Sequence, residues 1–238
     1  SSYLTLDGVE QSWRTTWEPP WAYSDISVIY HEMGHGFGMP HSSGDYGYVY
    51  DNVWDVMSAD RYNCDDAHID PVYGCLGQNT IAFHHDLVEW LAPEQIYSAD
   101  VGSHILTLEQ IDQPATDDYL MAKIPVEGSS NHFFTAEVRR RVGYDAKVPG
   151  DAVIIHEVDF DWGAHVVDSD WNEDTSDEGA MWRVGETFVD DTGEISITVD
   201  AATPTGFEIS IENNSEPPTD PYEPNDIWQD ATPIAYGA

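Results

Sequence analysis

The feature that most constrains this chain is a run of three histidines and one glutamate between His31 and His41. On a helix, residues four positions apart lie on the same face, so His31 and His35 can direct two ring nitrogens at one point. Gly38 follows this stretch, where a glycine can adopt a positive φ and let the chain turn sharply. That turn can bring His41 back as a third imidazole. The run therefore predicts a helix, a tight turn and a cluster of three histidines.

The same residues predict a zinc site that holds a reactive water. Three protein ligands leave one position on zinc open, which is typical of a catalytic rather than a structural site. Glu32 lies beside the first ligand and can accept the proton of that water as a general base. The alternative is a set of unrelated histidines on a partly buried helix. It requires the five fixed positions of HExxHxxGxxH to coincide by chance within 238 residues.

The chain resembles the metzincin zinc metalloproteases, and nearest among them the immune-inhibitor-A-like or gametolysin-like enzymes. The matching positions are His31, Glu32, His35, Gly38 and His41. Metzincins carry a methionine turn beneath the metal, and the sequence Asp-Val-Met-Ser at 55–58 is the candidate for it. The resemblance implies that Gly38 and Met57 support the site structurally, although Met57 also fits an ordinary core position.

By this resemblance we expect a secreted zinc-dependent endopeptidase with one catalytic zinc ion and a protein or peptide substrate. Some relatives have a metal-binding tyrosine two places after the methionine, but Ala59 stands there in this chain. Another group therefore has to stabilise the transition state. Tyr46, Tyr48 and Tyr50 are candidates to line the substrate cleft, and aromatic packing explains each of them equally well.

Two other functions stay open at this point. One is an extracellular binding or adhesion protein whose zinc site is vestigial, which the intact Glu32 disfavours. The other is a zinc amidase that acts on cell-wall peptide, because the motif describes water activation and not the substrate.

The charge of the chain limits its partners. It has 45 acidic and 8 basic residues and a formal net charge of -37. Such a surface repels nucleic acid and anionic membranes, and no segment is long and apolar enough to span a bilayer. We expect neither nucleic-acid binding nor membrane insertion, and the oligomeric state stays open. The charge suits a salt-rich medium or a protein that binds calcium.

A calcium site is one interpretation of an acidic loop in the second half of the chain. Its alternating polar residues are Asp168, Asp170, Asn172 and Asp174. Glu173 replaces the usual glycine, and Gly179 stands at the twelfth position, so the loop is no EF-hand. A looser Ca²⁺ site and a merely solvated acidic loop both remain possible interpretations.

Two cysteines, Cys64 and Cys75, favour a disulfide in an extracellular protein over a pair of free thiols. The chain begins at Ser1 without an initiator methionine or a signal peptide, which suggests a processed or excised piece of a precursor. We therefore expect a secreted, extracellular location.

The fold expected is α+β, with three parts. Residues 1–95 should form the C-terminal part of a metzincin catalytic domain, with an active-site helix capped by Ser24, the methionine turn and a closing helix over 80–91. Most of the upper half of such a domain is missing. Residues 96–213 should form an all-β sandwich, and residues 214–238 a Pro-rich linker with the truncated start of a bacterial pre-peptidase C-terminal module.

The expected sandwich rests on six short segments rich in β-forming residues, 104–108, 119–124, 133–138, 152–158, 194–199 and 207–211. Within it, residues 134–159 resemble the β-domain that follows the protease in immune-inhibitor-A-like enzymes. We expect His84, His85 and His156 to be structural, because none has metal-type spacing to a partner. The arginines at 139–141 should pair with neighbouring carboxylates.

Overall fold

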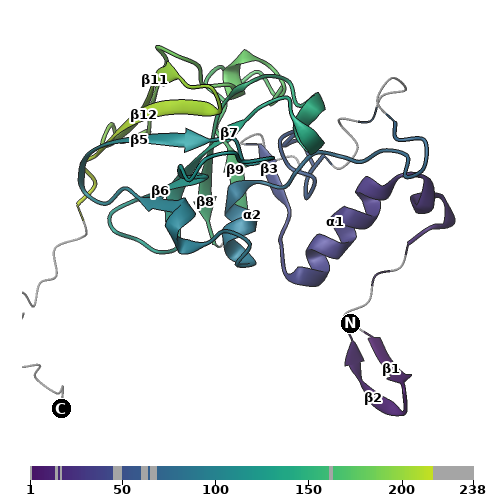
Figure 1. Ribbon diagram of the computed structural model, residues 1–238. Helices are drawn as coiled ribbons and strands as arrows, with labels where there is room; N and C mark the ends of the chain where they lie inside the picture. Colours follow the sequence, from purple (N-terminus) through teal and green to yellow (C-terminus); the bar gives the residue numbers. More distant parts are fainter. Residues whose placement is uncertain are drawn as a thin grey trace, which may run out of the picture.

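The structure is a computed structural model that describes residues 2–13, 16, 18–44, 50–59, 64, 69–160 and 163–216. Its helices are η1 (Pro20–Ser24), α1 (Ile26–Phe37), α2 (Ala82–Leu87), η2 (Pro93–Gln95), η3 (Gly143–Lys147) and η4 (Glu178–Ala180). Its strands are β1 (Ser2–Leu6), β2 (Val9–Trp13), β3 (Ser42–Gly44), β4 (Ile96–Ser98), β5 (Gly102–Glu109), β6 (Met121–Pro125), β7 (His132–Arg139), β8 (Ala152–Asp159), β9 (Gly163–Val166), β10 (Thr187–Val189), β11 (Ile195–Ala202) and β12 (Gly206–Asn213). This mixed composition, with more strand than helix, agrees with the expected α+β class (Figure 1).

Two sheets pack face to face as a sandwich. One has the strand order β10-β11-β12-β5 and the other β3-β9-β8-β7-β6-β4. Their facing side chains form the largest apolar core, with Leu108 and Ile209 from the first sheet and Ile124, Phe134 and Ile155 from the second. Each of the six expected β segments overlaps a strand of these sheets, although 119–124 and 194–199 begin before β6 and β11 do.

The second face of the six-stranded sheet is also covered, and this determines where the site lies. In β7 and β8 alternate residues point to opposite faces, and both kinds are buried. On the outer face, Phe133 and Val158 pack against residues of α2, while Ile154 packs against the turn that contains Trp54. Helix α2 and the turn that contains Trp54, both within residues 1–95, are therefore packed against the sandwich.

The same sheet joins the two units expected from the sequence. Strand β3 directly follows His41 and pairs in parallel with β9. Residues from both expected segments, 1–95 and 96–213, therefore lie in one sheet. The division into domains, and the assignment of the first part to a metzincin domain, stay predictions. Tyr46, Tyr48 and residues 217–238, with the linker and the start of the pre-peptidase module, lie outside the described residues.

Both expected helices differ from the prediction at their ends. Ser24 does not cap α1, because it closes η1 and the cap position is Asp25, whose side chain makes no capping bond. The second helix covers only Ala82–Leu87 rather than 80–91. Glu89 has a φ of 59°, a left-handed conformation that ends a helix before Pro93 is reached.

The N-terminal segment forms a hairpin, and the two cysteines form the expected disulfide. Strands β1 and β2 form an antiparallel hairpin around Asp7 and Gly8, and the hairpin projects away from the sandwich (Figure 1). Cys64 and Cys75 form a disulfide, which fits an extracellular protein. Among the described residues, no helix has the length and apolar character needed to cross a membrane.

Candidate metal centre

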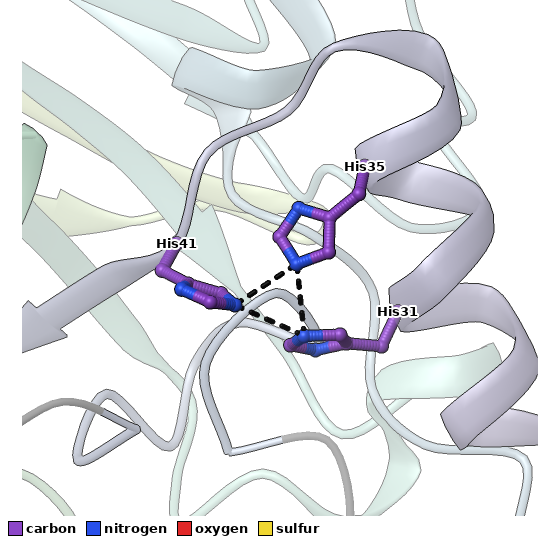
Figure 2. A group of neighbouring side chains, drawn as sticks. All are labelled: His31, His35 and His41. Atoms are coloured by element: carbon purple, nitrogen blue, oxygen red, sulfur yellow. Dashed lines mark hydrogen bonds between the residues drawn. The ribbon is translucent and has the colours of Figure 1, made fainter. Parts of the chain in front are cut away.

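Helix α1 and the turn after it place the three histidines. Gly38 ends the helix with a φ of 113°, and the N–H groups of Gly38 and Met39 both donate to the Gly34 carbonyl. This closure of the helix end needs a left-handed residue, which glycine adopts without a steric penalty. The chain then reverses, and His41 returns toward His31 and His35 (Figure 2).

The three imidazoles meet through one nitrogen each. The Nε2 atoms are 3.2 Å apart for His31 and His41, 3.2 Å for His31 and His35, and 2.9 Å for His35 and His41. Figure 2 shows these three atoms turned toward one another. Zn–N bonds of about 2.0–2.1 Å at tetrahedral angles put two ligand nitrogens about 3.3 Å apart. The observed separations are close to that value.

The hydrogen bonds of the rings show what the cluster can bind. Nδ1 of His31 lies 2.8 Å from the Val56 carbonyl, and Nδ1 of His35 lies 2.9 Å from the Met39 carbonyl. A carbonyl oxygen only accepts, so each Nδ1 carries the proton and each Nε2 of the neutral ring carries a lone pair. Two lone pairs facing each other repel unless a cation lies between them, so the donor set fits zinc.

The third histidine is also suited to bind a metal. Burial, together with the neighbouring His35 and His31 rings, lowers the pKa of His41 below its ordinary value. A lowered pKa keeps this imidazole neutral at physiological pH, as a metal ligand requires.

Met57 packs against helix α1. It is fully buried, and its sulfur lies so close to Gly34 that a Cβ at that position would be 2.2 Å from it. Any larger residue at position 34 would therefore push α1 away from the turn. Met39 and Val56 complete this small apolar cluster. Met57 thus contacts the helix that carries His31 and His35, and its role as a supporting methionine stays a prediction.

A buried carboxylate joins the segments that hold the ligands. Asp55 accepts hydrogen bonds from the Ser42 hydroxyl at 2.6 Å, the Thr80 hydroxyl at 2.7 Å and the Met57 N–H at 3.0 Å. His84 Nδ1 lies 3.1 Å from the same side chain. Burial alone would raise the pKa of Asp55, but His84 and these donors outweigh it and hold the pKa below its ordinary value. Asp55 is therefore an anion that connects Ser42, the turn that contains Met57, and the segment of Thr80 and His84.

Sequence reasoning expected His84 to be structural but did not find its pairing with Asp55, because the two lie in different elements. His85 and His156 likewise join no metal-type cluster among the described residues. His85 lies 3.1 Å from the Asn79 side-chain oxygen, and the Asn52 amide contacts His156 at 3.1 Å. Burial lowers the pKa of His156 to about 3, so its ring is neutral inside the protein.

Among the described residues, two of the three arginines pair with carboxylates through their side chains as expected, and Arg141 does not. Arg139 is fully buried and bonds to Glu137 at 3.1 Å and Asp145 at 2.7 Å, and Arg140 pairs with Asp151. Arg141 donates from its side chain to the carbonyls of Val148 and Pro149 instead.

The acidic loop is arranged differently from the predicted calcium ligand set. Carboxylate oxygens of Asp168, Asp170 and Asp177 lie within 4.8 Å of one another. Asp177 was not in the predicted set, while Asp174 accepts from the hydroxyl and N–H of Ser176. The Asn172 amide donates to both Asp170 and Asp177. Calcium binding at this loop stays a prediction.

Comparison with known proteins adds no relative. No protein-family profile matches the chain, and neither a curated protein nor a solved structure matches it. The functional argument therefore rests on the residues of this chain.

Proposed function

We propose that this protein is a secreted zinc-dependent endopeptidase. The observation that carries the proposal is the convergence of three Nε2 lone pairs from His31, His35 and His41, with a glutamate next to the first of them in sequence. When bound, zinc would supply a Lewis acid that activates water and polarises a peptide carbonyl. The disulfide between Cys64 and Cys75 supports an extracellular location.

The chain's own residues have distinct roles in this proposal. His31, His35 and His41 hold the metal, and the Val56 and Met39 carbonyls fix two of the rings. Glu32 is partly exposed, and its charge acts to raise the pKa of His41. In this proposal the Glu32 carboxylate takes a proton from the attacking water. It then gives that proton to the leaving amine. Gly38 makes the turn, and Met57 supports the helix from below.

The experiment that tests the proposal is a change of Glu32 to Gln. The variant should bind as much zinc as the unchanged protein, because Glu32 is not a ligand. It should lose nearly all cleavage of a casein substrate, because general-base catalysis contributes roughly 10²–10⁴-fold. Glu94→Gln, an exposed glutamate in η2, is the matched control and should cleave normally. Cleavage by Glu32→Gln at the rate of the control would contradict the mechanism.

A further inference from the structure

The roles assigned above include no residue that donates a hydrogen bond to the transition state of the proposed hydrolysis. Attack on a peptide carbonyl places negative charge on its oxygen, and enzymes meet that charge with a positioned hydrogen-bond donor. Two residues after Met57 the chain has Ala59, which offers no side-chain donor. The donor has to come from another segment that reaches the histidine cluster.

Tyr50 reaches this cluster. Its ring centroid lies 4.7 Å from that of His41, edge to face, and 6.0 Å from that of His31. The side chain is 49% exposed, so part of it is accessible to a substrate bound at the histidines. Among the tyrosines of the described residues, it alone makes ring contacts to members of this cluster, His31 and His41.

The backbone around Tyr50 fixes this placement. Its φ is 69°, a left-handed conformation that is unfavourable for a bulky residue and persists where the surroundings enforce it. The next residue supplies the restraint. The Asp51 carboxylate accepts from the Gly44 N–H at 2.7 Å, at the end of β3, and its carbonyl accepts from the Thr175 hydroxyl. Tyr50 is thus anchored to the strand that follows His41.

The hydroxyl of Tyr50 is available as a donor. It makes no hydrogen bond to any residue that the structure describes, while its ring packs against two ligand imidazoles. The hydroxyl of a tyrosine is a hydrogen-bond donor. We propose that Tyr50 is a catalytic residue whose hydroxyl donates a hydrogen bond to the developing oxyanion of the attacked carbonyl. This inference rests on the proposed endopeptidase function.

The test is Tyr50→Phe in the full chain, which keeps the ring contacts and removes only the hydroxyl. We expect kcat for a reporter peptide to fall on the order of 10²-fold, the usual effect of losing one oxyanion donor. KM, zinc content and melting temperature should stay unchanged. Tyr23→Phe, which removes the hydroxyl of a 77% exposed tyrosine in η1, should leave every one of these quantities unchanged.

A binding measurement separates catalysis from packing. A phosphonamidate peptide mimics the tetrahedral oxyanion, and its affinity for the zinc-loaded Tyr50→Phe protein should fall by at least tenfold. The affinity of an uncleaved substrate peptide, measured in the Glu32→Gln background, should not change with Tyr50→Phe. Tyr50→His, which restores a donor, should recover part of the phosphonamidate affinity.

The outcomes distinguish this inference from the proposed function. If the unchanged protein cleaves peptides and Tyr50→Phe has the same kcat and phosphonamidate affinity, Tyr50 has no role as a donor while the endopeptidase stands. If Tyr50→Phe weakens substrate and phosphonamidate binding equally, Tyr50 only shapes the cleft. If the unchanged protein binds zinc but does not cleave, the proposed function and the inference both fail.

Discussion

Two of the three histidines in the candidate metal centre are oriented by a hydrogen bond from the second nitrogen of the ring. His31 and His35 use Nδ1 to donate to the Val56 and Met39 carbonyls, which leaves Nε2 free for a metal. His156 shows the opposite case, a histidine used only as a buried neutral group. Its Nε2 faces the Asn52 amide, which can only donate, and it has no cationic role inside the fold.

Buried neutral His156 should make stability depend on pH. Its pKa is about 3 in the folded protein and close to 6.5 when unfolded, so between these values the unfolded state binds more protons. Stability is therefore full above about pH 6.5 and is lost as the pH falls toward 3. At pH 5 this one residue should cost about 2 kcal/mol relative to pH 7.

The measurement is urea unfolding of the metal-free protein at pH 7 and pH 5, compared with His156→Gln. The glutamine oxygen can still accept from Asn52 but does not titrate. The unfolding free energy of the variant should fall about 2 kcal/mol less on acidification than that of the unchanged protein. An equal fall in both proteins would show that His156 is not a neutral buried residue.

At the scale of elements, the site is a junction of segments held by Asp55. This carboxylate connects the start of β3 through Ser42, the methionine turn through Met57, and α2 through Thr80 and His84. Since Val56 lies inside this turn and fixes His31, a shift of Asp55 moves a ligand. Residues that orient ligands in this way typically affect metal affinity.

Asp55→Asn should therefore weaken zinc binding on the order of 10–100-fold. The amide replaces one acceptor oxygen with a donor. This donor then faces either the Ser42 hydroxyl and His84 or the Thr80 hydroxyl and the Met57 N–H. Competition with a chromophoric chelator, well below the melting temperature, measures the affinity of folded protein. Asp86→Asn, which removes a partly exposed partner of Lys123 at 3.9 Å, is the control. Unchanged zinc affinity in Asp55→Asn would show that the junction does not position the ligands.

Local sequence patterns predicted the parts of this site that are close in the chain. The helix, the turn at Gly38 and the three-histidine cluster follow from spacing alone, because all lie within one helix and its cap. The pairing of Asp55 with His84 and the approach of Tyr50 to His41 depend on packing between separate segments, which a single sequence does not encode visibly. The early end of α2 at Leu87 was missed because a left-handed conformation at Glu89 has no strong sequence signal.

At the scale of the whole molecule, alternating β segments predicted a sandwich, and two packed sheets are present. The sequence did not show that the second face of β7 and β8 is buried as well. That face carries the polar residues Glu137, Arg139 and His156, and all three are buried. The sandwich and the candidate metal centre therefore form one structural unit.

The net charge of the whole molecule also affects how a cation approaches the candidate metal centre. The net charge of the chain is -37, and the resulting surface potential should attract divalent cations toward the molecule. Specific retention still depends on the three Nε2 atoms, because exposed carboxylates hold a cation weakly in salt.

The most direct test of the account is elemental analysis of the purified protein after dialysis in high salt with a trace of zinc. The account predicts about one zinc per chain for a three-histidine site with an open position, and loss of that zinc in His35→Ala. The control variant His104→Ala, far from the cluster in sequence, should retain it. Absence of zinc from the unchanged protein, or full retention in His35→Ala, would contradict the proposed metal centre.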